Sequence, residues 1–480
     1  MSNQKWLMSQ EDPKITGDQK GKGGKRDPNR KYIAITRVSP GSYMSVLFVV
    51  SFAAAFLIYV ERDDAGILLF VVSILLIPLL AFTDRIGFDG KRLYRTGLIP
   101  GIWARLMKTR DRLRIGDIEQ VETQAVRALK RGRNVKYRFS TSVRGKGTQF
   151  TFTSGGESYR QMVKILLPLL RDDVLDSRSM ELRDYLTDPR EALQKAEASK
   201  IPSPDVLESS FARSMREKQR PRPSGEEIET SAANPIHLRQ LANQLRLSGF
   251  LLQAMEAFRR ALVVEPQDPW LLLECGRCLH SLAGSEKDVR LERRSLALMR
   301  LAEQRAGLDG DLLIRVGESY FQAGDWRRAG RVFRKVSDTL GETFRSVRGM
   351  AEMALREGKI AHVIHQFSAA DRLADSTALR RWARGEADYF SRLNDNEEYL
   401  ELEISRMNLI DRLERYQKIS LRAVLFGFPL ILVGVLGDQY TVADIGWAIS
   451  AIAMSLSFTC GLFGKFLGAR IEFDHLDSAK

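Results

Sequence analysis

The sequence predicts a multidomain membrane protein with two transmembrane helical hairpins, a small α+β barrel or sandwich, and an all-α solenoid. Three observations support this fold class. Four charge-free apolar runs lie in two pairs, one near each end of the chain. A strand-rich, basic stretch follows the first pair. A helical pattern then repeats along most of the remaining chain up to the second pair.

The apolar runs are Tyr43 to Val60, Gly66 to Phe82, Ala423 to Gly437 and Ile445 to Phe463. Each run is roughly 15 to 19 residues, near the length that crosses a hydrocarbon core of ~30 Å. Lipid offers the backbone no hydrogen bonds, so such a run spans as a helix. The third run is the shortest and contains Pro429, so a re-entrant or interfacial segment stays open there. A cleaved signal is disfavoured because a long region precedes the first run and a second follows at once.

Flanking charges predict the orientation of these runs. The turn inside the first pair is acidic, with Glu61, Asp63 and Asp64, and the turn inside the second holds Asp438 and no cation. Lysine and arginine lie at the opposite ends of all four runs. Positive residues mark the cytoplasmic side. We therefore predict a multi-pass protein of a bacterial cytoplasmic (inner) membrane, with the soluble domains and both termini in the cytoplasm.

Changes in composition divide the chain into seven segments. The predicted order is a disordered basic tail at 1–40, a transmembrane hairpin at 41–83, an α+β domain at 84–172, a linker at 173–233, helical repeats at 234–418, a second transmembrane hairpin at 419–466 and a C-terminal tail at 467–480. The linker is rich in charged residues, serine and proline, which indicates short helices at most and no large core.

The segment 84–172 has the pattern of several strands followed by one helix. Asp89-Gly90 between two short apolar runs predicts a hairpin. Alternation at Val135, Tyr137 and Phe139 predicts a half-buried strand. Further strands are expected over 113–123 and around Phe150 and Phe152, and an amphipathic helix is expected from Gly156 with Met162, Ile165, Leu166, Leu169 and Leu170 on one face.

This arrangement resembles the bacterial PH-like domains found on small membrane proteins. In them a membrane span often precedes a stretch like residues 85–97, with a later strand like 115–121. The resemblance implies a small barrel or sandwich closed by a C-terminal helix, and it leaves the ligand open.

The net charge of +14 is concentrated in the same domain. Nucleic acid and anionic lipid both suit such a surface. Because the domain directly follows a predicted membrane-spanning run, its basic surface already lies near lipid headgroups, and binding to lipid requires no further assumption. We therefore expect no nucleic-acid partner. Each basic residue near an anionic leaflet contributes ~1 kcal/mol. The candidate headgroup residues are Arg127, Lys130, Arg131 and Arg133. Arg144 and Lys146 belong to the next turn, which we expect at the opposite end of the meander. A solvated basic surface remains the alternative.

Residues 234–418 carry a 34-residue helical repeat. The best-marked copies contain Leu241, Ala242, Leu245, Gly249, Ala254, Phe258 and Ala261, then Val316, Gly317, Tyr320, Gly324, Ala329 and Phe333, then Ala351, Ala354, Gly358, Val363, Phe367 and Ala370. Another copy starts at Cys275 with its second helix delayed by a charged insertion over 284–294, and a degenerate fifth includes Ala387 and Phe390. This pattern resembles the tetratricopeptide repeat (TPR) family.

The TPR resemblance implies a solenoid whose concave face, formed by the first helix of each repeat, binds a protein or peptide. By that register the candidate peptide-binding residues are Arg239, Asn243, Arg246, Arg277, Phe321, Arg345 and Arg348. Their cations suit an acidic or C-terminal peptide. Arg239 and Asn243 match two positions of the carboxylate clamp of chaperone-binding repeats, but Glu274 and Asp311 replace an Asn and a Lys, which argues against a clamp.

The sequence shows no nucleophile motif, metal constellation or nucleotide loop, so we predict no enzyme activity, cofactor or metal. Cys275 and Cys278 precede Leu279, not the histidine that haem attachment needs, and the five histidines form no zinc pattern. The predicted function is a membrane-tethered protein-interaction scaffold. The alternatives are an anionic-lipid sensing module acting through the basic domain, and a non-catalytic accessory subunit of an envelope-biogenesis complex. The partner, the pathway and the oligomeric state do not follow from the sequence.

Overall fold

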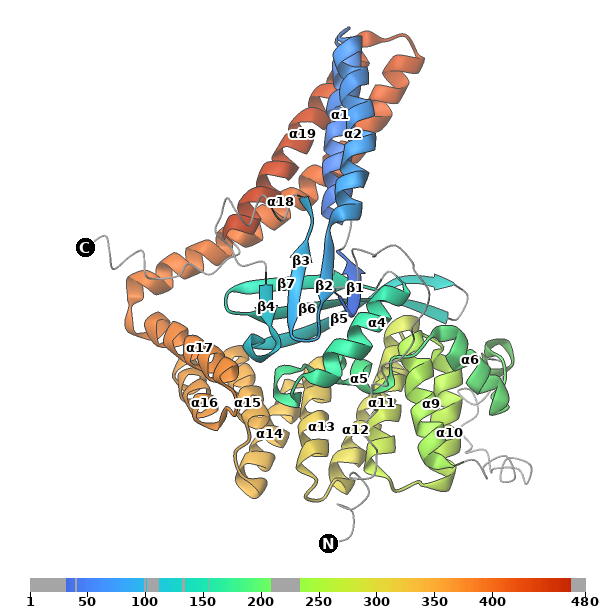
Figure 1. The fold of residues 1–480 in the computed structure, drawn as a ribbon, viewed down its shortest axis with the longest axis vertical. Helices are drawn as coiled ribbons and strands as arrows, with labels where there is room; N and C mark the ends of the chain where they lie inside the picture. The colour runs from blue at the N-terminus through green and yellow to red at the C-terminus, as the bar shows by residue number, and fades with distance from the viewer. Residues whose placement is uncertain are drawn as a thin grey trace, which may run out of the picture.

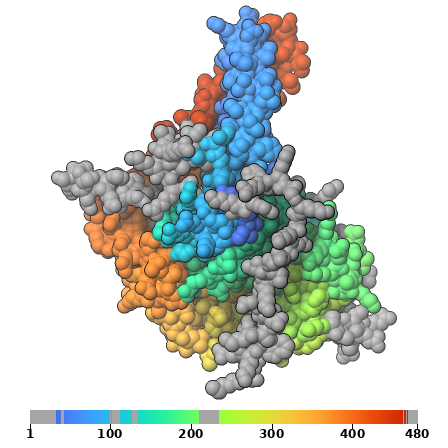
Figure 2. Space-filling view, in the orientation of Figure 1, coloured from blue at the N-terminus to red at the C-terminus, as the bar shows by residue number. Residues whose placement is uncertain are grey.

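The computed structural model describes residues 32–38, 41–98, 101, 112–131, 134–154, 156–208 and 234–467. Figure 1 shows three layers: a bundle of apolar helices, a layer of antiparallel strands, and an array of helices on the far side of the strands. Figure 2 shows the apolar helices projecting well beyond the rest of the molecule.

Four helices form the projecting bundle. They are α1 (Gly41–Tyr59), α2 (Asp63–Thr83), α18 (Glu397–Leu436) and α19 (Tyr440–Leu467). In the described chain, three of them, α2, α18 and α19, are long and apolar enough to cross a membrane, and α1 is a shorter apolar helix. The ring of Trp447 on α19 packs against Phe52, Phe56 and Tyr59 of α1, so the two helix pairs, far apart in sequence, lie side by side.

Helix α18 differs from the predicted division at residue 418. It is one continuous helix of 40 residues, about 60 Å long at 1.5 Å per residue. Its first half closes the helical array and its second half enters the bundle. The helix contains the charged residues Arg406, Lys418 and Arg422 without interruption. The change from charged to apolar residues therefore marks where α18 leaves the array and enters the bundle, and it does not mark the end of a helix.

In the described parts of the chain, the strands form two antiparallel sheets. One contains, in order, β1 (Ala34–Arg37), β2 (Arg85–Phe88), β3 (Arg92–Thr96) and β4 (Arg112–Arg114). The other contains β5 (Gln120–Arg131), β6 (Asn134–Gly145) and β7 (Thr148–Thr153). The hairpin predicted at Asp89-Gly90 is present: Gly90 has φ +93°, and the Asp89 carboxylate accepts the Arg92 N–H at 2.6 Å. The strand predicted over 113–123 is divided by a 3-10 turn at Ile115–Asp117.

Strand β1 corrects the prediction that residues 1–40 are a disordered tail. Ala34 pairs with Phe88 and Arg37 with Arg85. The hairpin α1–α2 is therefore an insertion between two neighbouring strands. Ala34 and Thr36 are buried, and this short alternation was hidden because it lies between a polar tail and a long apolar run.

The predicted linker 173–233 is structured over its first part. Helix α4 (Glu157–Leu166) follows the sheets as predicted, and two further helices, α5 (Ser177–Tyr185) and α6 (Pro189–Ala198), lie inside the predicted linker. Val174, Leu175, Met180 and Leu182 are buried, so this segment belongs to the core. The rest of the segment, 209–233, lies outside the described residues.

Five antiparallel helix pairs form the array, as the repeat pattern predicts. Their helices are α9 (Pro235–Ser248), α10 (Leu251–Val264), α11 (Pro269–Glu286), α12 (Val289–Arg305), α13 (Gly310–Gln322), α14 (Trp326–Leu340), α15 (Phe344–Arg356), α16 (Ile360–Leu373), α17 (Thr377–Asp395) and the first half of α18. The charged insertion predicted over 284–294 extends both helices of its repeat, so that α11 has 18 residues and α12 has 17.

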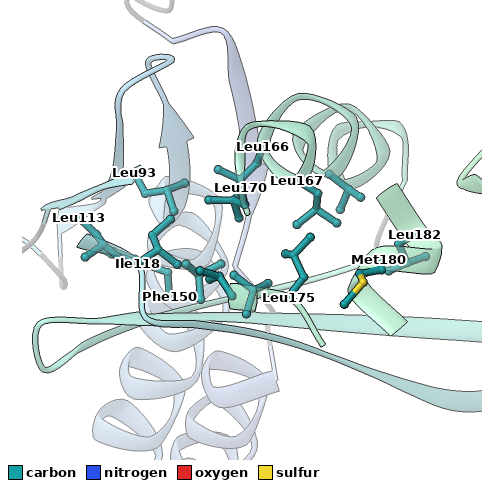
Figure 3. Close-up of a cluster of buried hydrophobic side chains, with 14 of the residues drawn as sticks. Leu93, Leu113, Ile118, Phe150, Leu166, Leu167, Leu170, Leu175, Met180 and Leu182 are labelled. Atoms are coloured by element: carbon teal, nitrogen blue, oxygen red, sulfur yellow. The ribbon is translucent and has the colours of Figure 1, made fainter. Parts of the chain in front are cut away.

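One hydrophobic core joins the sheets to the array. It contains Phe139, Phe152 and Leu166 from the sheet domain together with Leu247, Phe344 and Leu379 from the array. Figure 3 shows Met180 and Leu182 of α5 in this cluster with Leu175, Leu167 and Phe150. The sheets and the array are thus packed as one body.

Candidate functional site: the concave face of the array

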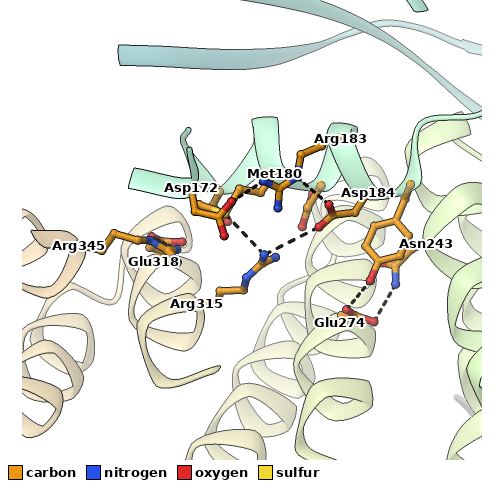
Figure 4. Close-up of polar contacts among 12 residues, drawn as sticks. Asp172, Met180, Arg183, Asp184, Asn243, Glu274, Arg315, Glu318 and Arg345 are labelled. Carbon is orange, nitrogen blue, oxygen red and sulfur yellow. Dashed lines mark hydrogen bonds and ion pairs between the residues drawn. The ribbon is translucent and has the colours of Figure 1, made fainter. Parts of the chain in front are cut away.

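Helix α5 lies along the concave face of the array, where sequence analysis placed a peptide site. Figure 4 shows it crossing the first helices of successive repeats, with its polar side chains directed toward them. The helix begins where the Asp176 carboxylate accepts the Ser179 N–H at 2.9 Å. On its other side, the Thr123 hydroxyl of β5 bonds the Ser179 hydroxyl at 2.8 Å. Helix α5 is therefore wedged between the sheet and the array.

Glu181 of α5 is the centre of this contact. Its carboxylate bonds the Arg246 guanidinium at 3.0 Å and the Arg277 guanidinium at 2.6 Å. All three side chains are buried, and Glu181 is only 4% exposed. Arg277 also donates to the Ser177 hydroxyl at 2.8 Å. Two of the predicted peptide-binding residues thus bind an acidic residue of the same chain.

The charges around Glu181 decide its protonation. Burial by itself raises the pKa of Glu181, but the charges of Arg246 and Arg277 outweigh it and leave that pKa lowered. Burial by itself lowers the pKa of Arg246, but the Glu181 charge and other nearby groups outweigh it and leave that pKa raised. The carboxylate is consequently ionised at neutral pH, and the contact is a buried ion pair with two cations and one anion.

Glu274 binds the two clamp-like residues. Arg239 donates two hydrogen bonds to its carboxylate, at 2.8 and 2.7 Å, and Asn243 donates a third at 2.7 Å. Tyr185, the last residue of α5, donates to the same carboxylate at 3.3 Å. Burial, followed by the Glu274 charge, raises the pKa of Tyr185 to about 12. Glu274 is the residue whose acidic side chain argued against a carboxylate clamp. Its carboxylate accepts hydrogen bonds from Arg239 and Asn243, the donors that would bind the terminus of a peptide in such a clamp.

Arg315 of α13 extends the contact and was missed by the sequence analysis. Its guanidinium is 3.9 Å from the Asp184 carboxylate of α5 and 3.5 Å from the Met180 sulfur. Arg183 pairs with Asp184 at 2.9 Å and also with Asp172 (Figure 4). The signal was available, because Arg315 lies on the first helix of its repeat, as Arg246 and Arg277 do on theirs.

The remaining candidates lie further along the face. Arg345 pairs with Glu318 at 2.7 Å, and Arg348 pairs with Glu352 at 3.1 Å while lying 5.3 Å above the Trp382 ring. With Phe321 they line a cavity of 180 Å³ that Asp173 and Asp176 close from the side of α5. Both arginines therefore have acidic partners on the array itself.

The candidate headgroup residues lie at one end of the long hairpin. The backbone of Arg127, Lys130 and Arg131 pairs with β6, and Arg133 lies outside the described residues. The turn at 146–147 is at the other end of β6, so the two basic turns are separate, as the meander predicts. Headgroup binding stays a prediction.

Among the described residues, no cluster of three or more His, Cys, Asp or Glu could hold a metal ion. Cys275 and Cys278 are buried and not in a disulfide, and burial raises the pKa of Cys278 to about 12. These thiols are therefore protonated helix-packing residues.

No protein-family model matches this chain, and no curated protein matches it. Two solved structures are similar. One is TTC0263, a thermophilic TPR protein in Thermus thermophilus, at 18% identity and TM-score 0.28, covering 41% of this chain and 96% of that one. The other is the APC/C hetero-tetramer Cut9-Hcn1, at 12% identity and TM-score 0.28, covering 63% of this chain and 53% of that one. At these scores the likeness carries no argument about function. The chain's own helix pairs show a TPR-like helical repeat.

Proposed function

We propose that this protein is a membrane-anchored, non-catalytic scaffold that holds a TPR-like array at the cytoplasmic face of a bacterial inner membrane, rigidly mounted on a PH-like domain. The observation that carries the proposal is the position of the apolar helices. They come from segments near both ends of the sequence, and they meet in a single bundle on one side of the packed body. Two hairpins that enter from opposite ends of the chain fix the body against the membrane more firmly than one.

The surface of the bundle supports the membrane part of the proposal. Leu75, Phe426 and Leu436 are 68%, 76% and 78% exposed, and many neighbouring apolar residues are exposed too. Continuous apolar surface of this extent marks contact with lipid or protein. In lipid these apolar side chains are removed from water, and each helix forms the hydrogen bonds of its own backbone N–H and C=O groups.

A buried carboxylate between the first hairpin and the sheet supports a fixed orientation of the body. Asp84, directly after α2, is fully buried and accepts two hydrogen bonds from Arg95 of β3, at 3.1 and 2.9 Å. The Tyr43 hydroxyl at the start of α1 donates to the same carboxylate at 2.9 Å. Both helices of the first hairpin are thereby tied to the sheet, and the sheet is packed on the array.

The concave face supports an assembly role of a particular kind. Its cations are matched by α5 and by acidic residues of the array, so the face joins the two domains of this chain. A partner protein is then expected on the outer surfaces of the array, and the ionisable side chains of the concave face are committed to structure and not to catalysis.

Lipid sensing is a second candidate, and one cavity favours it. A cavity of 450 Å³ lies where α2 meets the sheet, with Leu79 and Phe82 as apolar walls and Arg85 as the nearby cation. Arg37 lies 5.1 Å above the Phe82 ring beside it. A lipid headgroup with part of its acyl chains suits this combination. If this cavity binds lipid, Arg85→Gln should weaken binding of phosphatidylglycerol to the full chain in nanodiscs, and unchanged binding would count against this candidate.

Cysteine labelling in intact spheroplasts tests the anchoring. The native thiols at Cys275, Cys278 and Cys460 are buried, so the background is low. We expect a membrane-impermeant maleimide to label Arg62→Cys and Gln439→Cys, in the two hairpin turns, without permeabilisation. Exposed positions of the body, Lys136→Cys and Arg290→Cys, should label only after permeabilisation. Labelling of the body from outside, with the turns protected, would show the reverse orientation. Equal labelling of the turns and the body, in either condition, would rule out spanning.

A further inference from the structure

A basic groove runs along the outer side of the array. It consists of two adjoining cavities of 340 and 250 Å³, which share Gly330, Arg334, Met353 and Glu357. We name it the α14 groove and define it by Trp326, Arg327, Arg331, Arg334, Met353 and Arg356. It lies where α14 begins, beside the end of α15 and the start of α16.

The amphipathic pattern of α14 builds this groove. Ala329, Val332, Phe333 and Val336 are buried toward the neighbouring helices, so the arginines between them are left on the outer side. Gly330 forms the floor, where the atoms nearest to an added Cβ would be those of Met353 at 3.8 Å and the end of the Arg334 side chain at 3.9 Å. A small residue beside a buried methionine leaves room for a ligand side chain.

The charge of the groove is strongly positive and unmatched. Within the described chain, Arg327, Arg331 and Arg334 are exposed and form no ion pair, unlike the arginines of the concave face. The acidic residue of the groove, Glu357, is bound to Lys359 at 2.7 Å. Unpaired cations around a concave surface attract an anionic partner.

The groove also has an aromatic anchor point. Trp326 is 45% exposed, and the Arg356 guanidinium lies 5.0 Å above its ring and 5.6 Å from that of Phe321. Stacking holds the arginine in place with the N–H groups of its edge free to donate to carboxylates. Exposed Trp and Arg side chains around a concave apolar floor are typical of protein-binding hot spots.

The position of the groove indicates which anion it binds. Figure 1 shows α14 at the end of the molecule farthest from the apolar bundle, and Figure 2 shows this end clear of the bundle. If the bundle lies in a membrane, the groove lies on the part of the molecule remote from that membrane and from its headgroups. We propose that the α14 groove binds an acidic segment of a partner protein, with carboxylates on its arginines and one apolar side chain against Trp326 and Met353. This rests on the proposed scaffold function and names the surface through which it acts.

A peptide selection tests the proposal with the full chain in phosphatidylcholine nanodiscs. The probe is a displayed library of random twelve-residue peptides. We expect bound peptides to be enriched in Asp and Glu together with an aromatic or aliphatic residue. The double variant Arg331→Glu, Arg334→Glu should abolish that enrichment and weaken a selected peptide by about tenfold or more. Trp326→Ala should weaken it without changing its salt dependence.

A matched variant controls for net charge. Arg290→Glu with Arg293→Glu changes two exposed arginines of α12 that lie outside the groove, so the selected peptides should bind it as they bind the wild type. Equal loss in both double variants, or no acidic enrichment, would overturn the proposal. So would a groove variant that loses binding to phosphatidylglycerol vesicles or to single-stranded RNA and not to peptides. Failure here leaves the cysteine labelling result untouched, because nanodisc binding does not depend on membrane orientation.

Discussion

At the scale of single residues, the molecule depends on charges buried between its two domains. Glu181 forms ion pairs with both Arg246 and Arg277, and all three side chains are buried. A buried ion pair gives little stability relative to apolar residues, but removal of one member leaves uncompensated charge. The contact of Glu181 with the two arginines therefore specifies one position of α5 on the array.

Glu181→Gln should be strongly destabilising. The change is nearly isosteric, but it leaves two buried guanidinium groups without an anion, at a cost of about 3–5 kcal/mol. We expect this loss in the free energy of unfolding measured by urea denaturation in detergent. The matched control is Glu265→Gln, an exposed residue after α10, which should change stability by less than ~0.5 kcal/mol.

The pH dependence of that difference checks its cause. The pKa of Glu181 is lowered in the folded protein by Arg246 and Arg277 despite burial. Its stabilising contribution is therefore complete above the unfolded value of about 4.3 and is lost as the pH falls through the lower folded value. The gap between wild type and Glu181→Gln should shrink as the pH falls below about 4.3. A gap that stays constant down to about pH 3 would show that the mutation acts through packing and not through charge.

At the scale of elements, the turn after α9 shows how the array meets the sheet. Gly249 has φ +92°, which ends the helix in the left-handed region. Its carbonyl accepts the Val135 N–H of β6 at 3.1 Å, and a Cβ at Gly249 would lie 1.7 Å from the Val135 carbonyl oxygen. The repeat pattern explains this glycine as a turn residue. The structure adds a second reason, because only a residue without a side chain lets this turn approach β6 so closely.

Gly249→Ala and Gly324→Ala separate these two requirements. Gly324 ends the equivalent helix of a later repeat with φ +80°, but no atom lies within 4 Å of its added Cβ. Gly324→Ala should cost only the backbone strain of about 1–2 kcal/mol. Gly249→Ala should cost clearly more and should speed hydrogen exchange of the β6 amide at Val135. Equal costs and unchanged exchange would contradict a tight contact between this turn and β6.

At the scale of the whole molecule, the sheets and the array share one core and are bridged by charge at both ends of the concave face. Arg381 of α17 pairs with Glu119 beside β5 at 2.7 Å, and Arg171 pairs with Asp375. With the α5 contacts near the start of the array, these ion pairs secure the sheet domain at two separate places. The body then behaves as one unit mounted on the bundle.

Unfolding of this body should be a single transition. Because Phe139 and Phe152 of the sheets lie in one core with Phe344 and Leu379 of the array, neither part keeps its packing alone. We expect peptides from β6 and from α11 to lose protection at the same urea concentration in hydrogen-exchange mass spectrometry. Earlier exposure of β6 than of α11 would show that the sheets are a separate folding unit.

The sequence by itself determined the features that repeat locally. The alternating strand residues and the 34-residue helical pattern record a period of the backbone, and the four apolar runs record a helix length. They identified four apolar helices, most strands and all five helix pairs. Helix α5 carries no such period, and the alternation of β1 is too short to stand out beside a long apolar run, so each is identified only by partners distant in sequence. Only the tertiary structure showed that an acidic segment, predicted to be a linker, lies along the concave face. It also showed that the arginines predicted to bind a peptide form ion pairs with carboxylates of this same chain. The physical reason is that an ion pair depends on where side chains meet in space, which no local pattern encodes.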